Sequence, residues 1–201
     1  MWYWILRFYV RILLKLLFRL KIEGLENLPQ KTNFIIVANH TSYLDPLVVM
    51  AAVPRKIHCL AMRFLYKFLW LRWFLKLVET LPIGSSSQKA LDLLHKNQNV
   101  GLFPEGGVSR DGGLKSFRRG AALLAMKTGR PVVPCAVLGT FRALPLEAKF
   151  PKFVPLKLKI GKPIYLLKEF EDVIDDVYLQ EGIFKIRNKI KEMLSERGKI
   201  C

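Results

Sequence analysis

Short apolar runs rich in β-branched residues alternate along this chain with segments of helical periodicity, and this alternation limits the fold more than any other feature. Such alternation is typical of an α/β domain, in which helices cover a central sheet. The predicted strands are residues 34–38, 57–61, 100–103, 132–138 and 156–160, and the predicted helices are 46–52, 88–95, 117–128 and 183–194. We therefore expect a single α/β domain with a central, mostly parallel or mixed sheet flanked by helices.

The composition limits the size of the protein and the class of partner. The chain has 201 residues, of which 51% are hydrophobic, and its formal net charge is +17. The length suits one domain with a well-buried core. A chain that is both basic and apolar favours an anionic membrane surface as its partner, and a nucleic-acid-binding protein is the alternative. No helix-turn-helix, zinc-finger or aromatic RNA-binding signature accompanies the charge, so the alternative is the weaker one.

The cysteines give no sign of a structural cross-link. Cys59, Cys135 and Cys201 are far apart, odd in number and without any C-x-x-C spacing. This pattern indicates neither a disulfide framework nor a zinc site, and it fits a reducing compartment.

The first 22 residues form the pattern of an amphipathic helix. Arg7, Arg11, Lys15 and Arg19 recur every four residues, which is too frequent for a transmembrane span, and the segment lacks the features of a signal peptide. On a helix these cations form one drifting stripe. Apolar residues cover most of the remaining circumference: Trp2, Tyr3, Trp4, Ile5, Leu6, Tyr9, Leu13, Leu16, Leu17 and Phe18. We expect residues 1–22 to be a membrane-association helix lying in the interface of an anionic bilayer, and residues 23–201 to form the globular domain. The alternative is a helix packed on its own domain.

A second apolar and basic stretch, residues 63–78, does not place its cations on one helical face. A break near Trp70 reconciles them, so we predict two short helices there. These helices form either a second membrane-facing or groove-lining surface or a cap over the sheet.

The segment "FIIVANHTSYLDPLVV", residues 34–49, is the strongest local signal for chemistry. His40 and Asp45 can meet across the junction between a strand and a helix, where the carboxylate orients the imidazole as a general base. The alternatives are a helix N-cap for Asp45 and a structural loop histidine for His40. A triad reading through Ser42 has no spacing to support it, and His58 and His95 are interpreted as structural.

Glu105 directly follows a predicted strand in "GLFPEGGVSRDGG" and is either a solvated loop charge or part of a site. Together, Asn39 to Asp45, Phe103 to Gly106 and Pro131 to Pro134 resemble, in order and spacing, motifs of the glycerolipid acyltransferases of the lysophosphatidic acid acyltransferase type. The resemblance covers about residues 20–165, and the motifs taken together are more specific than any one of them.

This resemblance implies direct acyl transfer, without an acyl-enzyme, from acyl-CoA or an acyl carrier protein to a lysophospholipid hydroxyl. The first expectation for the acceptor is 1-acylglycerol-3-phosphate, which yields phosphatidic acid. His40 is then the base and Asp45 its orienting partner, with no metal and no cofactor beyond the thioester co-substrate. The residues expected to bind the acceptor are Glu105, Gly106, Gly107, Ser109 and Arg110, and the N–H groups of the two glycines could face the oxyanion. The resemblance also implies a monotopic protein on the cytoplasmic face of the cell membrane.

The chain departs from the family pattern at two arginines. Val108 stands where the third motif has an arginine, and "TLPIGSSSQK" offers Ile83, Gly84 and Ser85 where the second motif ends in one. Valine cannot make the charge-assisted contact by which arginine binds phosphate. Two explanations stay open: the acceptor carries no phosphate at that place, or another cation binds it, the candidates being Lys89, Arg110, Lys115, Arg118 and Arg119.

Overall fold

The computed structural model describes residues 2–61, 66–67, 72–73, 75, 80–82, 86–167 and 175–196. The strands are β1 Lys21–Glu23, β2 Ile35–Ala38, β3 Ile57–Ala61, β4 Leu81–Pro82, β5 Asn99–Leu102, β6 Val132–Leu138 and β7 Lys157–Ile160. The helices are α1 Trp2–Phe18, α2 Asp45–Ala52, α4 Ser86–His95, α5 Gly120–Thr128, α6 Thr140–Ala143 and α7 Asp176–Ser195, and a short 3-10 helix, η1, covers Leu25–Asn27.

The strands form one mixed sheet in the order β1-β7-β6-β2-β5-β3-β4. Neighbouring strands are parallel except for β6 and β7, which pair antiparallel. Every residue of β2, β5 and β6 is buried, as continuous apolar strands in the middle of a covered sheet must be. The expected α/β domain with a mixed sheet is confirmed.

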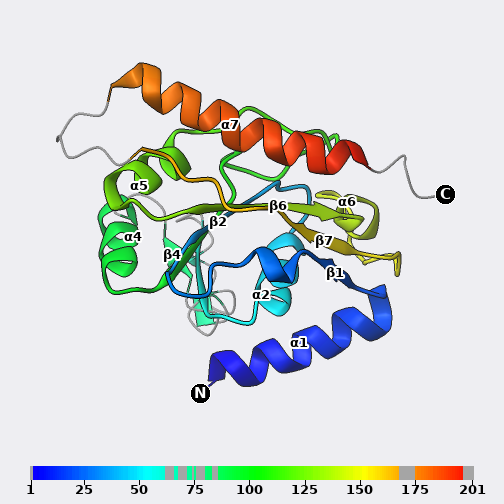
Figure 1. Cartoon of the computed structure of the whole chain (residues 1–201). Coiled ribbons are helices and arrows are strands. Elements are labelled where there is room, and N and C mark those ends of the chain that lie inside the picture. The colour runs from blue at the N-terminus through cyan, green and yellow to red at the C-terminus, as the bar shows by residue number, and fades with distance from the viewer. Residues whose placement is uncertain are drawn as a thin grey trace.

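Two hydrophobic cores fill the two faces of the sheet (Figure 1). The first contains residues of α1 and α2 packed on side chains of β2, β6 and β7. The second contains residues of α4, α5 and α7 packed on the opposite side chains of β2, β5 and β6. The sheet thus carries helices on both faces, and the carboxyl ends of β2, β5 and β6 meet at one edge.

The predicted strands agree with the structure to within one residue at each end. Strands β1 and β4 were not predicted, because β1 has only three residues and β4 only two, which is too few to form a recognisable pattern. The helix predicted from residue 117 begins only at Gly120. The backbone N–H of Arg118 donates to Pro104 O at 2.8 Å, which holds residues 117–119 to the loop after β5. At its other end the chain forms a longer helix than expected, since α7 begins at Asp176. The two short helices predicted within residues 63–78 lie largely outside the described residues.

Helix α1 packs on the domain with one face and exposes the other. Tyr3, Leu14 and Phe18 are buried, so Tyr3 and Phe18 belong to the core rather than to the membrane-facing set. Arg7 Nε donates to the backbone oxygens of Met50 (3.2 Å) and Val53 (2.9 Å) at the carboxyl end of α2. The boundary predicted at residue 22 falls within β1, which is paired in the sheet.

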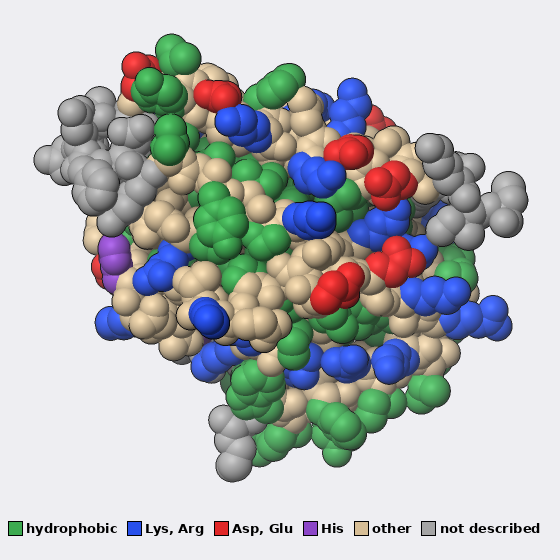
Figure 2. All heavy atoms as spheres, in the orientation of Figure 1, with side chains coloured by type: hydrophobic (Ala, Val, Ile, Leu, Met, Phe, Trp, Pro, Cys, Tyr) green, Lys and Arg blue, Asp and Glu red, His purple; other side chains and the backbone are tan. Residues whose placement is uncertain are grey.

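The outer face of α1 is a band of exposed apolar side chains. Figure 2 shows this band at the lower edge of the molecule, below a row of lysine and arginine side chains. The members of the band are Trp2, Trp4, Ile5, Phe8, Tyr9, Ile12, Leu13, Leu16 and Leu17. None of the helices in the described part of the chain has the length and hydropathy needed to cross a bilayer.

Candidate active site

The site is built at the carboxyl end of β2, where Asn39 anchors the chain to β6. The Asn39 side-chain amide donates to Val137 O at 3.0 Å, and its oxygen accepts from Val137 N at 2.8 Å. Asn39 is 2% exposed, and both of its polar groups are satisfied. This two-way bond extends the pairing of β2 with β6 by one step and fixes where the next residue, His40, leaves the sheet.

His40 and Asp45 meet as expected from their spacing. His40 Nδ1 lies 3.0 Å from Asp45 Oδ2. A carboxylate only accepts, so Nδ1 carries the proton and Nε2 is the basic nitrogen. The Asp45 side chain is fully buried, whereas that of His40 keeps 14% of its surface exposed. The imidazole ring also lies against the ring of Phe103, with 4.4 Å between the centroids. The pair therefore has a buried, fixed acid end and an accessible basic end.

Asp45 is the partner of His40 but not a helix N-cap. It is the first residue of α2, and the capping position is occupied by Leu44, which makes no side-chain bond to the helix. Asp45 Oδ2 instead accepts from the backbone N–H groups of Thr41 (2.6 Å) and Ser42 (2.8 Å) in the preceding turn. A negative charge at this end of α2 also interacts favourably with the helix dipole. The N-cap alternative is therefore wrong, and the carboxylate folds the loop that carries His40.

Ser42 has its hydroxyl engaged away from the histidine. Ser42 Oγ donates to Leu144 O at 2.6 Å and accepts from Leu44 N at 3.1 Å. Ser42 is completely buried. A hydroxyl held in this way cannot serve as a nucleophile for His40, which decides against a serine triad.

Glu105 is a buried part of the same site and not a solvated loop charge. It is 7% exposed, and its two oxygens accept from His40 N (2.7 Å) and Lys115 N (3.0 Å). On the other side, Ser109 N donates to His40 O at 2.8 Å. The loop after β5 thus holds the peptide groups of His40 from both sides. Burial raises the pKa of Glu105 above its ordinary value, an effect that the backbone hydrogen bonds from Lys115 and His40 oppose.

The two glycines after Glu105 differ in what surrounds them. Gly106 has a positive φ of 73° and donates its N–H to Phe103 O at 3.2 Å. The guanidinium of Arg118 lies directly over Gly106, in the space that a Cβ would occupy. The positive φ favours glycine here, and a larger residue would also displace the Arg118 side chain. The Gly107 N–H has no hydrogen-bond acceptor among the described residues.

Four of the remaining predicted residues, Ser109, Arg110, Lys115 and Arg119, belong to the loop between β5 and α5. Ser109 is buried, and its hydroxyl donates to Asp111 Oδ1 at 2.7 Å, while Arg110 is exposed. Lys115 Nζ donates to the backbone oxygen of Val108 at 2.9 Å, so this ammonium group already has an acceptor. Arg119 and Lys89 are exposed, and Ser85 is outside the described residues.

Sequence reasoning missed the segment that follows β6. Thr140 Oγ1 lies 3.2 Å from Thr41 Oγ1, and Leu144 O accepts the Ser42 hydroxyl. Thr140 and Leu144 of this segment therefore contact the histidine loop, next to the two bonds between Val137 of β6 and Asn39. A Gly-Thr pair directly after a buried strand was the available signal, but a loop contact at a sequence distance of 99 residues leaves no local pattern.

Across the part of the chain that the structure describes, no three His, Cys, Asp or Glu side chains gather closely enough to hold a metal ion. The site offers an imidazole held in one orientation, with a basic nitrogen that can accept a proton, as general-base chemistry requires. A glycine-rich loop lies beside this imidazole.

Comparison with known proteins identifies the family. A family model described as Acyltransferase matches residues 19–138, which is more than half of the chain. The chain belongs to the acyltransferase family. This membership favours the acyltransferase interpretation over the nucleic-acid-binding alternative.

Among the relatives of this family member is the 1-acyl-sn-glycerol-3-phosphate acyltransferase of Bacillus subtilis, 32% identical over 164 residues, with 78% of this chain and 79% of that protein covered. A chloroplastic 1-acyl-sn-glycerol-3-phosphate acyltransferase, BAT2 of Brassica napus, is 29% identical over 89% of this chain. The chain spans about half of that longer protein (52%) and 38% of the chloroplastic LPAT1 of Arabidopsis thaliana.

The fold also matches a solved structure. The crystal structure of PlsC, the lysophosphatidic acid acyltransferase of Thermotoga maritima, superposes with a TM-score of 0.72. The match covers 96% of this chain and 83% of that chain at 24% identity. The likeness shows that the two chains share a fold.

Proposed function

We propose that this protein is an O-acyltransferase that moves a fatty acyl group from a thioester donor to the free hydroxyl of 1-acylglycerol-3-phosphate, which yields phosphatidic acid. The observation that carries the proposal is the 3.0 Å pair of His40 and the buried Asp45, in a member of the acyltransferase family. The names of the relatives from Bacillus and Brassica support the choice of acceptor.

In the proposed reaction, Nε2 of His40 takes the proton of the acceptor hydroxyl as its oxygen attacks the thioester carbonyl carbon. An ester bond forms, the carbon–sulfur bond breaks, and the leaving thiolate takes up the proton from the imidazolium. Asp45 stabilises that imidazolium and holds the ring with Nδ1–H toward itself. Assistance by a general base typically accelerates such a step by about 10²- to 10⁴-fold.

The negative charge on the carbonyl oxygen needs a donor in the transition state. The Gly106 N–H is already bonded to Phe103 O, whereas the Gly107 N–H has no acceptor among the described residues. We assign the oxyanion role to Gly107, because a backbone N–H beside the base can donate to developing charge.

Arg118 is the cation best placed to bind the acceptor phosphate in the absence of an arginine at position 108. Its guanidinium lies against Gly106, next to Glu105, and its backbone is bonded to Pro104. The side chain of Arg118 is exposed and has no carboxylate partner among the described residues. In contrast, the ammonium of Lys115 donates to Val108 O. The acceptor-binding roles of Glu105, Gly106, Gly107, Ser109 and Arg110 stay predictions, with Glu105 and Ser109 acting through their bonds to His40.

Val108 also favours a second candidate, an acyltransferase whose acceptor has no phosphate at this place. The two candidates are separated by a product analysis with lysophosphatidic acid, monoacylglycerol and lysophosphatidylcholine as acceptors, using acyl-CoA and acyl carrier protein as donors. We expect a preference for lysophosphatidic acid that Arg118→Gln reduces and that the matched Arg119→Gln leaves in place. A wild-type preference for the neutral or zwitterionic acceptors would establish the second candidate, and Val108→Arg would then shift activity toward lysophosphatidic acid.

The reaction itself is tested with His40→Ala. We expect this variant to lose turnover of every acceptor while keeping the thermal melting temperature of the wild type. Retained turnover in His40→Ala would remove the general base from the mechanism.

The proposal includes attachment to one leaflet of an anionic membrane through the exposed face of α1 (Figure 2). The apolar band of α1 is flanked by cations, as in helices that lie in a bilayer interface. Phe153, 64% exposed, packs edge-on against Phe18 with 5.4 Å between the ring centroids and extends this apolar surface past the end of the helix. The lipid acceptor would then reach the site from the membrane, at the cytoplasmic face.

Membrane attachment is tested without disturbing the core. Leu13→Ser/Leu16→Ser alters two exposed side chains of α1, and the control Val177→Ser/Phe184→Ser alters two exposed side chains of α7. We expect the α1 variant to lower co-flotation with vesicles containing phosphatidylglycerol by at least about tenfold, because two leucines leave the interface. Equal flotation of both variants would show that α1 does not mediate attachment.

A further inference from the structure

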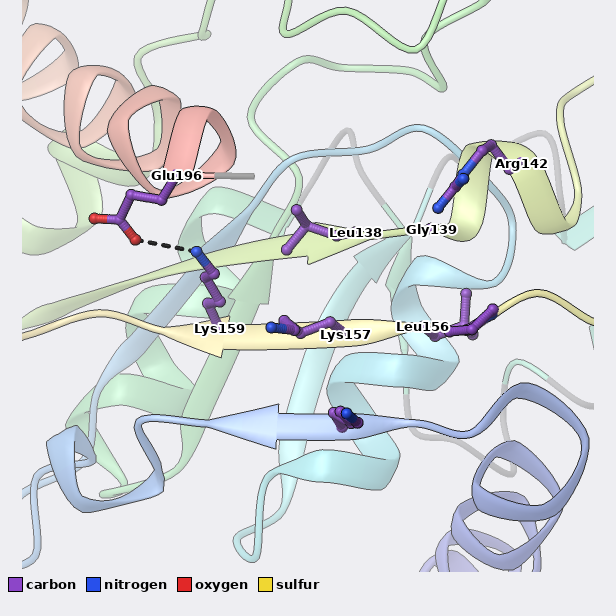
Figure 3. Close-up of a pocket in the computed structure, with 9 residues that line it drawn as sticks. Leu138, Gly139, Arg142, Leu156, Lys157, Lys159 and Glu196 are labelled. Atoms are coloured by element: carbon purple, nitrogen blue, oxygen red, sulfur yellow. Dashed lines mark hydrogen bonds and ion pairs between the residues drawn. The ribbon is translucent and has the colours of Figure 1, made fainter. Parts of the chain in front are cut away.

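A basic cavity of about 270 Å³ opens beside the candidate active site, at the edge of the sheet where β6 ends. Its walls come from the end of β6, from α6 and from β7 and β1 (Figure 3). Lys21, Arg142, Lys157 and Lys159 line it together with one carboxylate, Glu196. The lining therefore carries four positive charges against one negative charge.

Two of these cations lack a carboxylate partner in the described part of the chain. Lys157 Nζ lies 2.8 Å from Glu23 Oε1, and Lys159 Nζ lies 3.0 Å from Glu196 Oε2. Lys21 and Arg142 are exposed, and no acidic side chain among the described residues lies within ion-pair distance of either. An anion entering the cavity would therefore meet two cations that need not give up an existing ion pair.

The cavity is connected to the catalytic loop through one short segment. Leu138, Gly139 and Arg142 line the cavity, while Thr140 and Leu144 of the same segment contact the histidine loop. Thr140 Oγ1 lies 3.2 Å from Thr41 Oγ1, and Leu144 O accepts from Ser42 Oγ at 2.6 Å. A ligand held in the cavity thus lies next to the residues that position His40.

The two lysines that β7 contributes to the cavity lie on the sheet face opposite the core that α1 packs on. In β7, Leu158 and Ile160 point into the core shared with α1 and α2. Because side chains alternate along a strand, Lys157 and Lys159 point to the other face of the sheet, where Lys159 also donates to Met193 O of α7. The position favours a ligand that arrives from water over the headgroup of a lipid bound at α1.

We propose that this cavity binds the phosphate groups of coenzyme A, so that the thioester donor is an acyl-CoA. The inference rests on the proposed function for the need of a thioester donor. Clustered phosphates suit a recessed site lined by several Lys and Arg side chains, which donate charge-assisted hydrogen bonds. An acyl carrier protein, whose acidic surface is convex and much larger than the cavity, fits this recess less well.

The test replaces Lys21 and Arg142, the two cavity cations without a carboxylate partner among the described residues. Lys21→Gln/Arg142→Gln removes two charges from the cavity, and Lys96→Gln/Lys191→Gln removes two exposed charges from α4's end and α7 as a matched control. We expect the cavity variant to raise the KM for acyl-CoA by roughly tenfold, as the loss of two partly screened charge-assisted contacts implies. The kcat/KM for the corresponding acyl-pantetheine, which has no phosphate, should stay at the wild-type value.

A binding measurement separates this inference from the proposed function. Titration of the full chain with coenzyme A by calorimetry should show binding that the cavity variant weakens and the control retains, even if no acceptor were acylated. Absence of coenzyme A binding, equal KM values in both variants, or activity with acyl carrier protein alone would overturn the inference. Loss of phosphatidylglycerol vesicle binding in the cavity variant, with the KM for acyl-CoA unchanged, would identify a lipid contact instead and also overturn it.

Discussion

Replacement of Asp45 by asparagine tests the central pair with a minimal change of shape. The asparagine oxygen can occupy the position of Oδ2 and still accept from Thr41 N and Ser42 N, which lie 2.6 and 2.8 Å from it in the wild type. The amide therefore keeps the loop hydrogen bonds and removes the negative charge. Because Asp45 is fully buried, no water can substitute for that charge beside His40.

The size of the effect follows from the geometry. Two unit charges 3.0 Å apart attract by about 5 kcal/mol at an effective dielectric constant of about 20. The asparagine oxygen still accepts a neutral hydrogen bond from Nδ1–H, so the net loss is about 3 kcal/mol of imidazolium stabilisation. This loss appears only when the imidazolium forms, and it lowers kcat by roughly 10²-fold.

The assay is a steady-state measurement of kcat and KM with lysophosphatidic acid and acyl-CoA, accompanied by thermal melting of each variant. We expect Asp45→Asn to lower kcat with little change in KM, and to melt within a few degrees of the wild type. His40→Ala/Asp45→Asn should be no less active than His40→Ala alone, since the two side chains act as a unit. A kcat within fivefold of the wild type in a folded Asp45→Asn protein would refute the role of the carboxylate.

Three further predictions concern residues around this pair. Ser42→Ala should keep kcat within a few-fold of the wild type and lower the free energy of unfolding by about 1–2 kcal/mol. The reason is that the Ser42 hydroxyl donates to Leu144 O and not to His40. Loss of activity without loss of stability would instead indicate a catalytic serine. Glu105→Gln tests the raised pKa of Glu105. A raised pKa means that Glu105 binds its proton more tightly in the folded protein than in the unfolded chain. The stability of the wild type relative to Glu105→Gln should therefore fall as pH rises from the ordinary pKa of 4.5 through the raised value and stay constant above it, as measured by urea unfolding; a difference that grew with pH would contradict this sign. Arg7→Ala should destabilise the fold by about 1–2 kcal/mol because Arg7 Nε bonds two carbonyl groups at the end of α2, whereas the neighbouring Arg11→Ala should have little effect.

The same short segment, Leu138 to Leu144, takes part in both proposals. It holds the histidine loop through Thr140 and Leu144 and lines the basic cavity through Leu138, Gly139 and Arg142. Binding of a donor in the cavity would therefore affect the segment whose residues contact the histidine loop. Helices α1 and α7 lie on opposite faces of the sheet (Figure 1), and the loop that carries His40 leaves the sheet at the carboxyl end of β2.

The sequence by itself determined the α/β fold and the meeting of His40 with Asp45. Continuous apolar strands such as residues 132–138 show their burial in their composition, and a strand followed by His40, Asp45 and a helix-opening proline allows only a meeting across a turn. These are local properties, in which neighbours along the chain decide the outcome. The family motifs at Phe103 to Gly106 were equally visible, because they too are contiguous.

Only the tertiary structure decided what each of these residues contacts. The sequence could not tell that Glu105 accepts from the backbone of His40, 65 residues away, or that Arg118 covers Gly106. Nor could it divide α1 into a face buried by Tyr3, Leu14 and Phe18 and a face left exposed. Apolar residues cover most of the circumference of this helix, so their pattern does not say which part of it meets the domain. The four cations of the cavity come from three separate elements, so no contiguous sequence motif predicts them. Contacts between distant segments depend on how the sheet orders its strands, and that order is a property of the folded chain alone.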